Sequence, residues 1–442
     1  MTTQIDRPNR TVERWRDLDL LRVLLVFGLI FFHTARIFDT IALPEGVKND
    51  STSVLATLLV AFFSLWGMPL MMVIAGFATW QSLRRRSGKL FLRERVQRLL
   101  VPFVFGVLVI VPPQVYLHLE QADPAGSLTY LQFLPQFFDV RLCPDLLSAF
   151  ICPDPSTGLF TTAHLWFLRD LFIFSVLLLP LFLYLRSQKG ARVVGSLAGF
   201  VARPGAILLL ALPVAVVEAG LVYSNMGGGW NEYTYAVLVV CGFLTAADVR
   251  FRQAMGRGWW IALLVGLVAA LVYIVGLYIL SEVYDVDPLH SYDWRSILWR
   301  MVQGVGAWAW VVAILGFGSR PRPSRDPKGY QKPLGSRPGL GARIIAYAGE
   351  AFLAVYILHQ TIVFTIGYYV VQWQTAALLK YAVISLAALA VTLLLYEFAV
   401  RRTRVTRWLF GMRPESKRAG DPSRAPSQGP GIMKEETTWK GS

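Results

Sequence analysis

The feature that most constrains this chain is a series of ten apolar stretches, most of them long enough to cross a membrane. A helix needs about 20 mainly apolar residues to span the roughly 30 Å hydrocarbon core of a bilayer. The composition agrees, with 55% hydrophobic and 16% charged residues over 442 positions. We therefore predict an all-α polytopic membrane protein with about ten transmembrane helices. The predicted spans are 19–40, 55–82, 99–118, 162–185, 205–224, 233–247, 259–281, 296–317, 345–371 and 376–400.

Basic residues alternate between the segments that connect these spans. The N-terminal tail, every second connection and the segment after the last span carry 32 Lys and Arg residues, whereas the intervening connections carry only Lys48 and Arg141. The positive-inside rule places the basic segments and both termini in the cytoplasm, which requires an even number of spans. The net charge of +15 therefore reflects topology and contact with anionic lipid. Nucleic acid is excluded as a partner because no basic module interleaved with aromatic residues is present.

The pattern predicts three regions in a protein of the cell (inner, cytoplasmic) membrane. Residues 1–17 form a cytoplasmic N-terminal tail, 18–410 the transmembrane domain, and 411–442 a disordered cytoplasmic tail rich in Pro, Ser and Gly. In the outer connection 119–161, Cys143 and Cys152 could form a disulfide or remain as two thiols, and both alternatives stay open. We expect Cys241 to be buried in the sixth span.

Two ionisable side chains share one face of the first predicted span. Arg22 and His33 are eleven residues apart, which is three helical turns plus about 20° of rotation and about 16 Å along the axis. Insertion scales assign about 2.5–3.5 kcal/mol to a charged side chain at the centre of a membrane helix, so such residues are functional candidates first. We expect the chemistry of this protein to lie along that face.

Other ionisable residues fall at a similar depth in other spans. His359 lies about as far from the inner end of span nine as His33 lies from the inner end of span one. Arg36 follows His33 by one turn. We hypothesise a cluster of His33, Arg36, Asp170, Glu218 and His359 in the outer half of the membrane, although sequence alone does not say which helices touch.

Two further pairs are candidates for ligand contact. Arg95 and Arg98 lie three residues apart, on one face of a predicted helix that leads into span three. Guanidinium groups form paired hydrogen bonds with phosphate oxygens. A simple stop-transfer cluster is the alternative interpretation. His164 and Trp166 open span four near the outer surface, where they would contact substrate or belong to the interfacial aromatic belt.

Four motifs together resemble the acyltransferase-3 family of integral membrane O-acyltransferases. The resemblance covers about residues 15–410, with the motifs in the family's order. Within the family, the segment around His164 and the ending LYEFAVRRTRVTRWLFGMRP are most similar to a branch associated with succinylation of periplasmic glucans. The motifs are Asp19-Leu-Leu-Arg22 with His33 eleven residues on, Arg95-x-x-Arg98 followed by Pro102, His164-Leu-Trp-Phe-Leu168, and Tyr356-Ile-Leu-His359.

The resemblance implies transfer of an acetyl or succinyl group from cytoplasmic acyl-CoA to a hydroxyl of an extracytoplasmic carbohydrate. His33 would be the general base or a transient acyl carrier, and both roles stay open. Acyl-CoA would be a co-substrate, with no permanently bound cofactor and no metal. The implied residues are His33, Arg22 and His359 for catalysis, Arg95 and Arg98 for CoA, and Arg36, His164, Trp166, Asp170 and Glu218 for the acceptor.

Two other functions are compatible with the same residues. A transporter or flippase for an anionic or lipid-linked solute could use the buried charges as a relay. A non-catalytic membrane scaffold would account for the topology but not for the alignment of Arg22 with His33. Release of CoA from acyl-CoA by the purified protein separates the enzyme from both alternatives.

Overall fold

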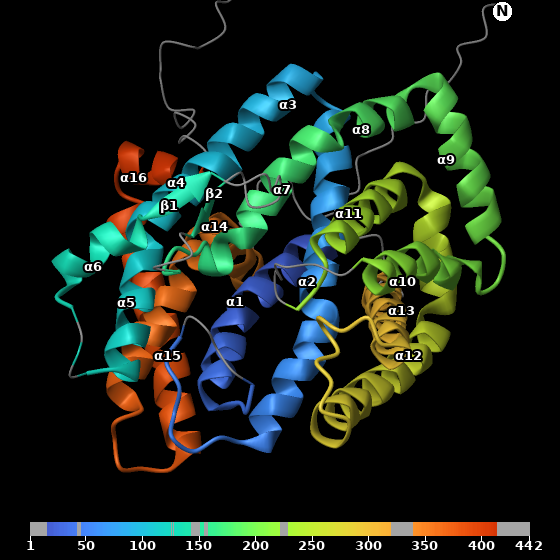
Figure 1. Cartoon of the computed structure of the whole chain (residues 1–442). Helices are drawn as coiled ribbons and strands as arrows, with labels where there is room; N and C mark the ends of the chain where they lie inside the picture. The colour runs from blue at the N-terminus through green and yellow to red at the C-terminus, as the bar shows by residue number, and fades with distance from the viewer. Residues whose placement is uncertain are drawn as a thin grey trace, which may run out of the picture.

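The chain folds into a helical bundle, seen here in a computed structural model (Figure 1). The structure describes residues 16–41, 46–124, 126, 128–142, 151–153, 158–221, 229–319 and 339–412. Within these ranges the β-structure is one antiparallel hairpin of β1 (Val140–Leu142) and β2 (Ile151–Pro153), with Arg141 opposite Cys152. The predicted all-α membrane fold is therefore confirmed.

The α-helices carry the labels of Figure 1, and the short 3-10 and π helices are labelled η. The first half of the chain forms α1 (Arg16–Phe38), α2 (Val54–Leu83), α3 (Gly88–Arg95), η1 (Val96–Leu100), α4 (Val101–Phe105), η2 (Gly106–Ile110), α5 (Val111–Ala122), α6 (Tyr130–Phe137), η3 (Ala163–Leu165), α7 (Trp166–Leu177), α8 (Leu179–Arg186), α9 (Gln188–Val201) and η4 (Ala206–Leu210). The second half forms α10 (Ala211–Gly220), α11 (Glu232–Ala247), α12 (Val249–Tyr278), η5 (Ile279–Val283), α13 (Trp294–Gly318), α14 (Leu340–Val370), α15 (Ala377–Leu395), η6 (Tyr396–Val400) and α16 (Arg404–Leu409).

Each predicted span coincides with helical structure. Among the described residues, seven helices are long and apolar enough to cross a membrane, and an eighth span results if the bent pair α7 and α8 counts as one. That pair bends by 54°, next to Pro180 near the start of α8. The fifth and sixth predicted spans are shorter helices, Ala206–Gly220 and Glu232–Ala247. The total of ten spans and the side of the termini stay predictions.

Two segments expected to connect spans are helical instead. Ser187 caps α9 by accepting a hydrogen bond from Gly190 N at 3.2 Å, and Asp248 caps α12 in the same way, 2.9 Å from Arg250 N. The third predicted span begins earlier, at Gly88. Hydropathy missed these parts because capped, amphipathic segments form helices without being apolar throughout.

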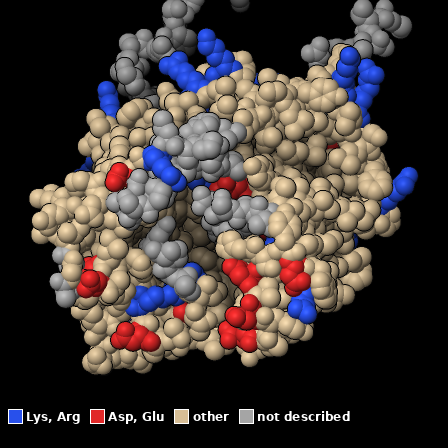
Figure 2. Space-filling view, in the orientation of Figure 1, with Lys and Arg blue, Asp and Glu red and all other residues tan. Residues whose placement is uncertain are grey.

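The ends of the bundle differ in charge. The connections α1–α2, α12–α13 and α14–α15 lie at the lower end of Figure 1, and the α2–α3 turn lies at the upper end. In the same orientation, Lys and Arg gather mostly toward the upper end and Asp and Glu toward the lower end (Figure 2). This separation agrees with the alternation of basic connections in the sequence.

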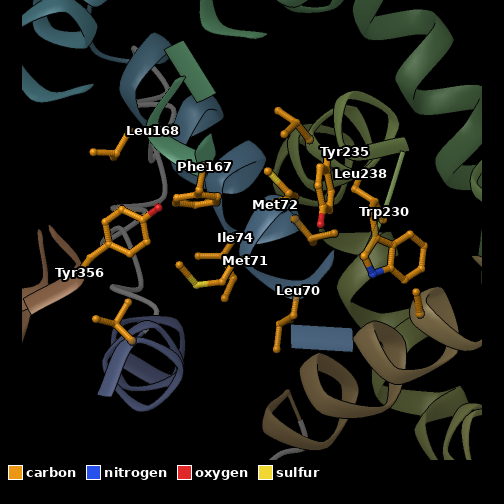
Figure 3. Close-up of a cluster of buried hydrophobic side chains, with 14 of the residues drawn as sticks. Leu70, Met71, Met72, Ile74, Phe167, Leu168, Trp230, Tyr235, Leu238 and Tyr356 are labelled. Carbon is orange, nitrogen blue, oxygen red and sulfur yellow. The ribbon is translucent and has the colours of Figure 1, made fainter. Parts of the chain in front are cut away.

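Helix α2 runs through the centre of the core. Its backbone crosses α11 so closely that a Cβ added to Gly76 would lie 2.0 Å from Val239 O, and one added to Gly242 would lie 2.0 Å from Val73 O. Only glycine fits at such a crossing, as in other close pairs of membrane helices. Figure 3 shows the α2 side chains Leu70, Met71, Met72 and Ile74 lying between Phe167 and Tyr356 on one side and Trp230 and Tyr235 on the other.

Several predictions fall on residues outside the described ranges. These include most of the N-terminal tail, residues 413–442 of the C-terminal tail, and Cys143, so the proposed pairing of Cys143 with Cys152 stays a prediction. Cys241 is buried in α11, as expected.

Candidate active site

A large cavity opens inside the bundle. Its volume is about 1910 Å³, and its walls come from α1, α2, the start of α7, α12, α13 and α14. A hollow is visible in the face shown in Figure 2. Pockets for small ligands usually measure about 300–1,000 Å³, so this cavity has room for more than one small substrate. Its polar wall contains His33, Arg36, His164 and His359.

Three histidine rings from three different helical segments meet at this wall. The ring centroids of His33 and His359 are 5.1 Å apart, and those of His359 and His164 are also 5.1 Å apart. The first pair is tilted by 51° and the second is edge-on at 82°. Helix α1 supplies His33, η3 supplies His164, and α14 supplies His359. The predicted proximity of His33 and His359 is therefore present, with His359 in the middle of the three.

Backbone carbonyls determine the proton positions on two of the rings. His359 Nδ1 lies 2.6 Å from Tyr356 O, and His164 Nε2 lies 2.9 Å from Ile357 O. Since a carbonyl oxygen only accepts, each of these nitrogens carries the proton. In the neutral rings, His359 Nε2 and His164 Nδ1 therefore hold lone pairs. Neither nitrogen has a hydrogen-bond partner among the described residues.

The three histidines differ in exposure. All three border the cavity, but His359 is fully buried and His164 is only 6% exposed, whereas His33 is half-buried. The side chain of His164 is buried, and the OH of Tyr356 donates a hydrogen bond to its backbone carbonyl. Its expected position near the outer surface of the membrane stays a prediction. Of the three, His33 is the one best placed to meet a substrate in the cavity.

Arg36 borders the cavity one turn from His33, as predicted. Its NH1 lies 2.5 Å from Asp39 Oδ2. Lys48 forms an ion pair with the same carboxylate and also donates to the backbone oxygen of Arg36 at 2.8 Å. These contacts hold Arg36 in place beside the histidines.

Of the five residues in the hypothesised cluster, His33, Arg36 and His359 border the cavity, and Asp170 and Glu218 do not. Asp170 is fully buried and pairs with Arg169 at 2.8 Å. Glu218 is also fully buried and accepts from Asn231 N at 3.2 Å, next to the start of α11. Neither carboxylate borders the cavity. Their position at similar depth predicted proximity to His33, but their side chains lie between helices instead.

Sequence reasoning missed Glu232 as a cavity residue. Arg169 NH2 lies 2.5 Å from Glu232 Oε1, and both residues border the cavity, as does Trp166. The predicted sixth span began at residue 233, so Glu232 was treated as part of a connection. The adjacent charges of Arg169 and Asp170 were the available signal, since buried charges need partners from other helices.

The predicted phosphate-binding residues Arg95 and Arg98 form a second group with Arg22, which was predicted to be catalytic. Arg22 lies over the Phe352 ring of α14, with its guanidinium carbon 5.0 Å from the centroid. Arg95 lies over the Phe91 ring at 4.7 Å and donates to Thr79 Oγ1 at 3.2 Å. Arg95 and Arg22 lie close enough for their like charges to interact, so we treat them as one basic cluster.

Arg98 completes this basic cluster of Arg22, Arg95 and Arg98. It lies in the π-helical turn η1 and its Nε is 3.5 Å from Glu94 Oε1. Among the described residues, those bordering the cavity include none of the three arginines. The histidines and the basic cluster are thus separate sites joined by α1.

Within the described part of the chain, no group of three or more His, Cys, Asp or Glu residues is arranged to hold a metal ion. Two of the rings already use one nitrogen each on backbone carbonyls. The lone pairs of His164 Nδ1 and His359 Nε2 can accept protons.

Together, the fold and the site define a multi-pass membrane protein with a histidine-lined internal cavity. A family model described as an acyltransferase domain matches residues 15–397, and the chain therefore belongs to this acyltransferase family. The predicted family resemblance is confirmed, and the protein is a membrane acyltransferase.

Several relatives carry the name glucans biosynthesis protein C. The protein of that name from Escherichia coli K12 is 22% identical over 418 residues, which cover 91% of this chain and 96% of the relative. Proteins with the same name from the E. coli strains O157:H7 EC4115 and O9:H4 HS show the same identity and coverage. No solved structure matches the chain.

Proposed function

We propose that this acyltransferase moves an acyl group from cytoplasmic acyl-CoA to a hydroxyl of an extracytoplasmic glycan, across the cell (inner) membrane. The observation that carries the proposal is that α1 bears both groups this reaction needs. Arg22 belongs to the basic cluster, and His33 borders the cavity eleven residues further along. The two are about 16 Å apart along the helix.

The donor would bind at the basic cluster. Arg95 and Arg98 offer guanidinium groups for the phosphates of CoA, and Arg22 would lie nearer the thioester end, on the helix that also carries His33. The thioester end of the extended pantetheine arm would reach the histidines along the seam between α1 and α14. Arg22 lies on that seam, over Phe352.

The acceptor would enter the cavity and present a hydroxyl to His33. His33 would take the proton from this hydroxyl as its oxygen attacks the thioester carbonyl carbon. A C–O bond forms and the C–S bond breaks, and His33 then returns the proton to the departing sulfur. The products are the acyl ester of the glycan and free CoA.

His359 would support His33 in this reaction. Its Nδ1 proton is held on Tyr356 O, so the lone pair of Nε2 is available beside the His33 ring. A neighbouring neutral imidazole can share the proton that His33 takes up. His164 would hold the far side of the His359 ring, through the edge-on contact.

The name of the relatives suggests which acceptor to test first. Because they are called glucans biosynthesis protein C, we propose a periplasmic glucan as the acceptor and a succinyl or acetyl group as the cargo. The purified protein in lipid nanodiscs would be incubated with succinyl-CoA and acetyl-CoA separately, with and without glucan. Free CoA is measured with a thiol reagent, and the molecular mass of the glucan is measured by mass spectrometry.

We expect glucan to accelerate CoA release from one of the two donors, with a matching mass gain on the glucan. His33→Ala should abolish both while the protein remains folded and inserted. His118→Ala is the matched control, because His118 bonds Gly46 O and does not border the cavity. Turnover of His33→Ala at the wild-type rate would refute the role of His33. No CoA release from either donor by the wild type would favour transport.

A burst of CoA release in the absence of glucan distinguishes the two roles of His33. A transient acyl carrier would release one CoA per protein before any acceptor is added. A general base would not. We expect no burst, because direct transfer needs both substrates together in a cavity large enough to hold them.

A further inference from the structure

Trp166 forms a fixed aromatic wall of the cavity. Its ring stacks on Tyr235 with a centroid distance of 5.2 Å and an interplanar angle of 16°. Tyr235 is fully buried in α11 behind it, where Figure 3 shows it beside Trp230 and Met72. One face of the indole is thus supported by the core, and the rest of Trp166 borders the cavity.

A buried ion pair lies next to this ring. Arg169 and Glu232 are 8% and 6% exposed, and both border the same cavity. Arg169 is held from two sides, by Glu232 at 2.5 Å and by Asp170 at 2.8 Å. Since Trp166 and Arg169 are three residues apart on α7, their side chains share one helix face. The wall therefore combines a flat apolar ring with two immobilised charged groups.

This combination matches the surface of a sugar ring. A pyranose has an apolar face of C–H bonds and a rim of hydroxyl groups that both donate and accept. A supported indole suits the C–H face, because aromatic rings contribute large contact area at little entropic cost. A carboxylate accepts from hydroxyl groups and a guanidinium donates to them, and a few fixed polar groups in an apolar wall set ligand orientation.

The position of this wall suits an acceptor in the proposed reaction. His164 precedes Trp166 by two residues and contacts His359, which in turn contacts His33. A ring stacked on Trp166 would therefore share the cavity with His33, the histidine that receives the proton. An ion pair that only tied α7 to α11 would have no reason to border the cavity together with an aromatic ring.

We propose that Trp166, Arg169 and Glu232 form a pyranose-binding subsite for the acyl acceptor. The inference rests on the proposed function for the reaction at His33. It adds the residues that recognise a sugar ring of the acceptor. Trp166 binds the C–H face of the ring, and the Arg169–Glu232 pair binds two of its hydroxyl groups. Asp170 is a positioning residue for Arg169.

Binding without any donor tests the subsite independently of acyl transfer. Saturation-transfer NMR would follow a β-linked glucose trisaccharide and, separately, sorbitol, which has hydroxyl groups but no ring. We expect the wild type to bind the trisaccharide and to show no saturable binding of sorbitol. Trp166→Leu should weaken trisaccharide binding about tenfold, the upper end of what one ring contact contributes, and Trp166→Phe about threefold.

Two further variants complete the binding test. Trp373→Leu is the matched control, because Trp373 is exposed and does not border the cavity, and it should bind as the wild type does. Glu232→Gln should also weaken binding about tenfold while keeping the size of the side chain. Wild-type affinity in folded Trp166→Leu and Trp166→Phe, or equal losses in Trp166→Leu and Trp373→Leu, would overturn the subsite.

Turnover measurements separate this inference from the proposed function. In Trp166→Phe the KM for the trisaccharide should rise with little change in kcat, because the ring contact is made before the transition state. Trisaccharide binding without CoA release would refute the proposed function and leave the subsite standing. Glucan-dependent CoA release with an unchanged KM in Trp166→Phe would refute the subsite alone.

Discussion

The contact between His33 and His359 predicts strong coupling when both are substituted. A general base contributes about 10²- to 10⁴-fold to the rate, and a 10³-fold loss corresponds to about 4 kcal/mol of transition-state stabilisation. With ring centroids 5.1 Å apart, the two residues would act as one unit. Residues that act as a unit show non-additive losses.

The experiment is a double-mutant cycle with His33→Ala and His359→Gln. Gln keeps much of the volume of the fully buried His359 ring, which limits the loss of packing. We expect each single variant to lower kcat/KM about 10³-fold and the double variant to lose little more, giving a coupling free energy of about 4 kcal/mol. CoA release with succinyl-CoA or acetyl-CoA and glucan provides the rates.

Independent action of the two histidines would give a different result. Their losses would then multiply to about 10⁶-fold in the double variant. Such additivity would refute the argument that His359 serves His33, even if each residue mattered alone. His118→Ala again reports any general effect of losing a histidine, since its ring bonds a backbone carbonyl elsewhere.

Three further predictions concern packing and the donor site. Gly76→Ala should lower the melting temperature, since the added Cβ would lie 2.0 Å from a backbone oxygen of α11 and overpacking costs about 1–3 kcal/mol. Gly349→Ala is the control and should leave the melting temperature unchanged, because its Cβ would have no heavy atom within 4 Å. Equal melting curves for the two variants would contradict the close crossing of α2 and α11. In steady-state assays, Arg95→Lys should raise the KM for acyl-CoA about tenfold. The KM for acyl-pantetheine should not change, because acyl-pantetheine lacks the nucleotide phosphates. Equal increases for both donors would indicate a purely structural arginine. Gly411→Val should lower stability, because Gly411 has a φ of +63° that residues with a side chain rarely adopt. It should also raise the KM for acyl-CoA, because the added Cβ would lie 3.0 Å from Arg98 O. An unchanged KM in the folded variant would separate this C-terminal segment from the donor site.

Local chemistry made much of the fold predictable. Long apolar runs can satisfy their backbone groups in a bilayer only by forming helices, so each predicted span coincides with helical structure. The face shared by Arg22 and His33 follows from helical geometry alone. The boundaries were less predictable, as at Glu232, where a polar residue belongs to the first turn of α11.

The contacts between helices required the tertiary structure. Sequence placed His33, Asp170 and Glu218 at similar depth, but depth leaves the rotation and neighbours of each helix open. The structure brings His33 to His359 and directs both carboxylates away from the cavity.

What the sequence determined by itself is therefore the class of protein, the approximate spans and the chemical groups that α1 carries, because these depend on composition and helical periodicity. Only the tertiary structure decided that His164 and His359 join His33, and that Glu232 meets Arg169 at the cavity wall. Those choices depend on which side chains pack between helices distant in sequence. Packing of that kind is a property of the whole bundle, and no single helix encodes it.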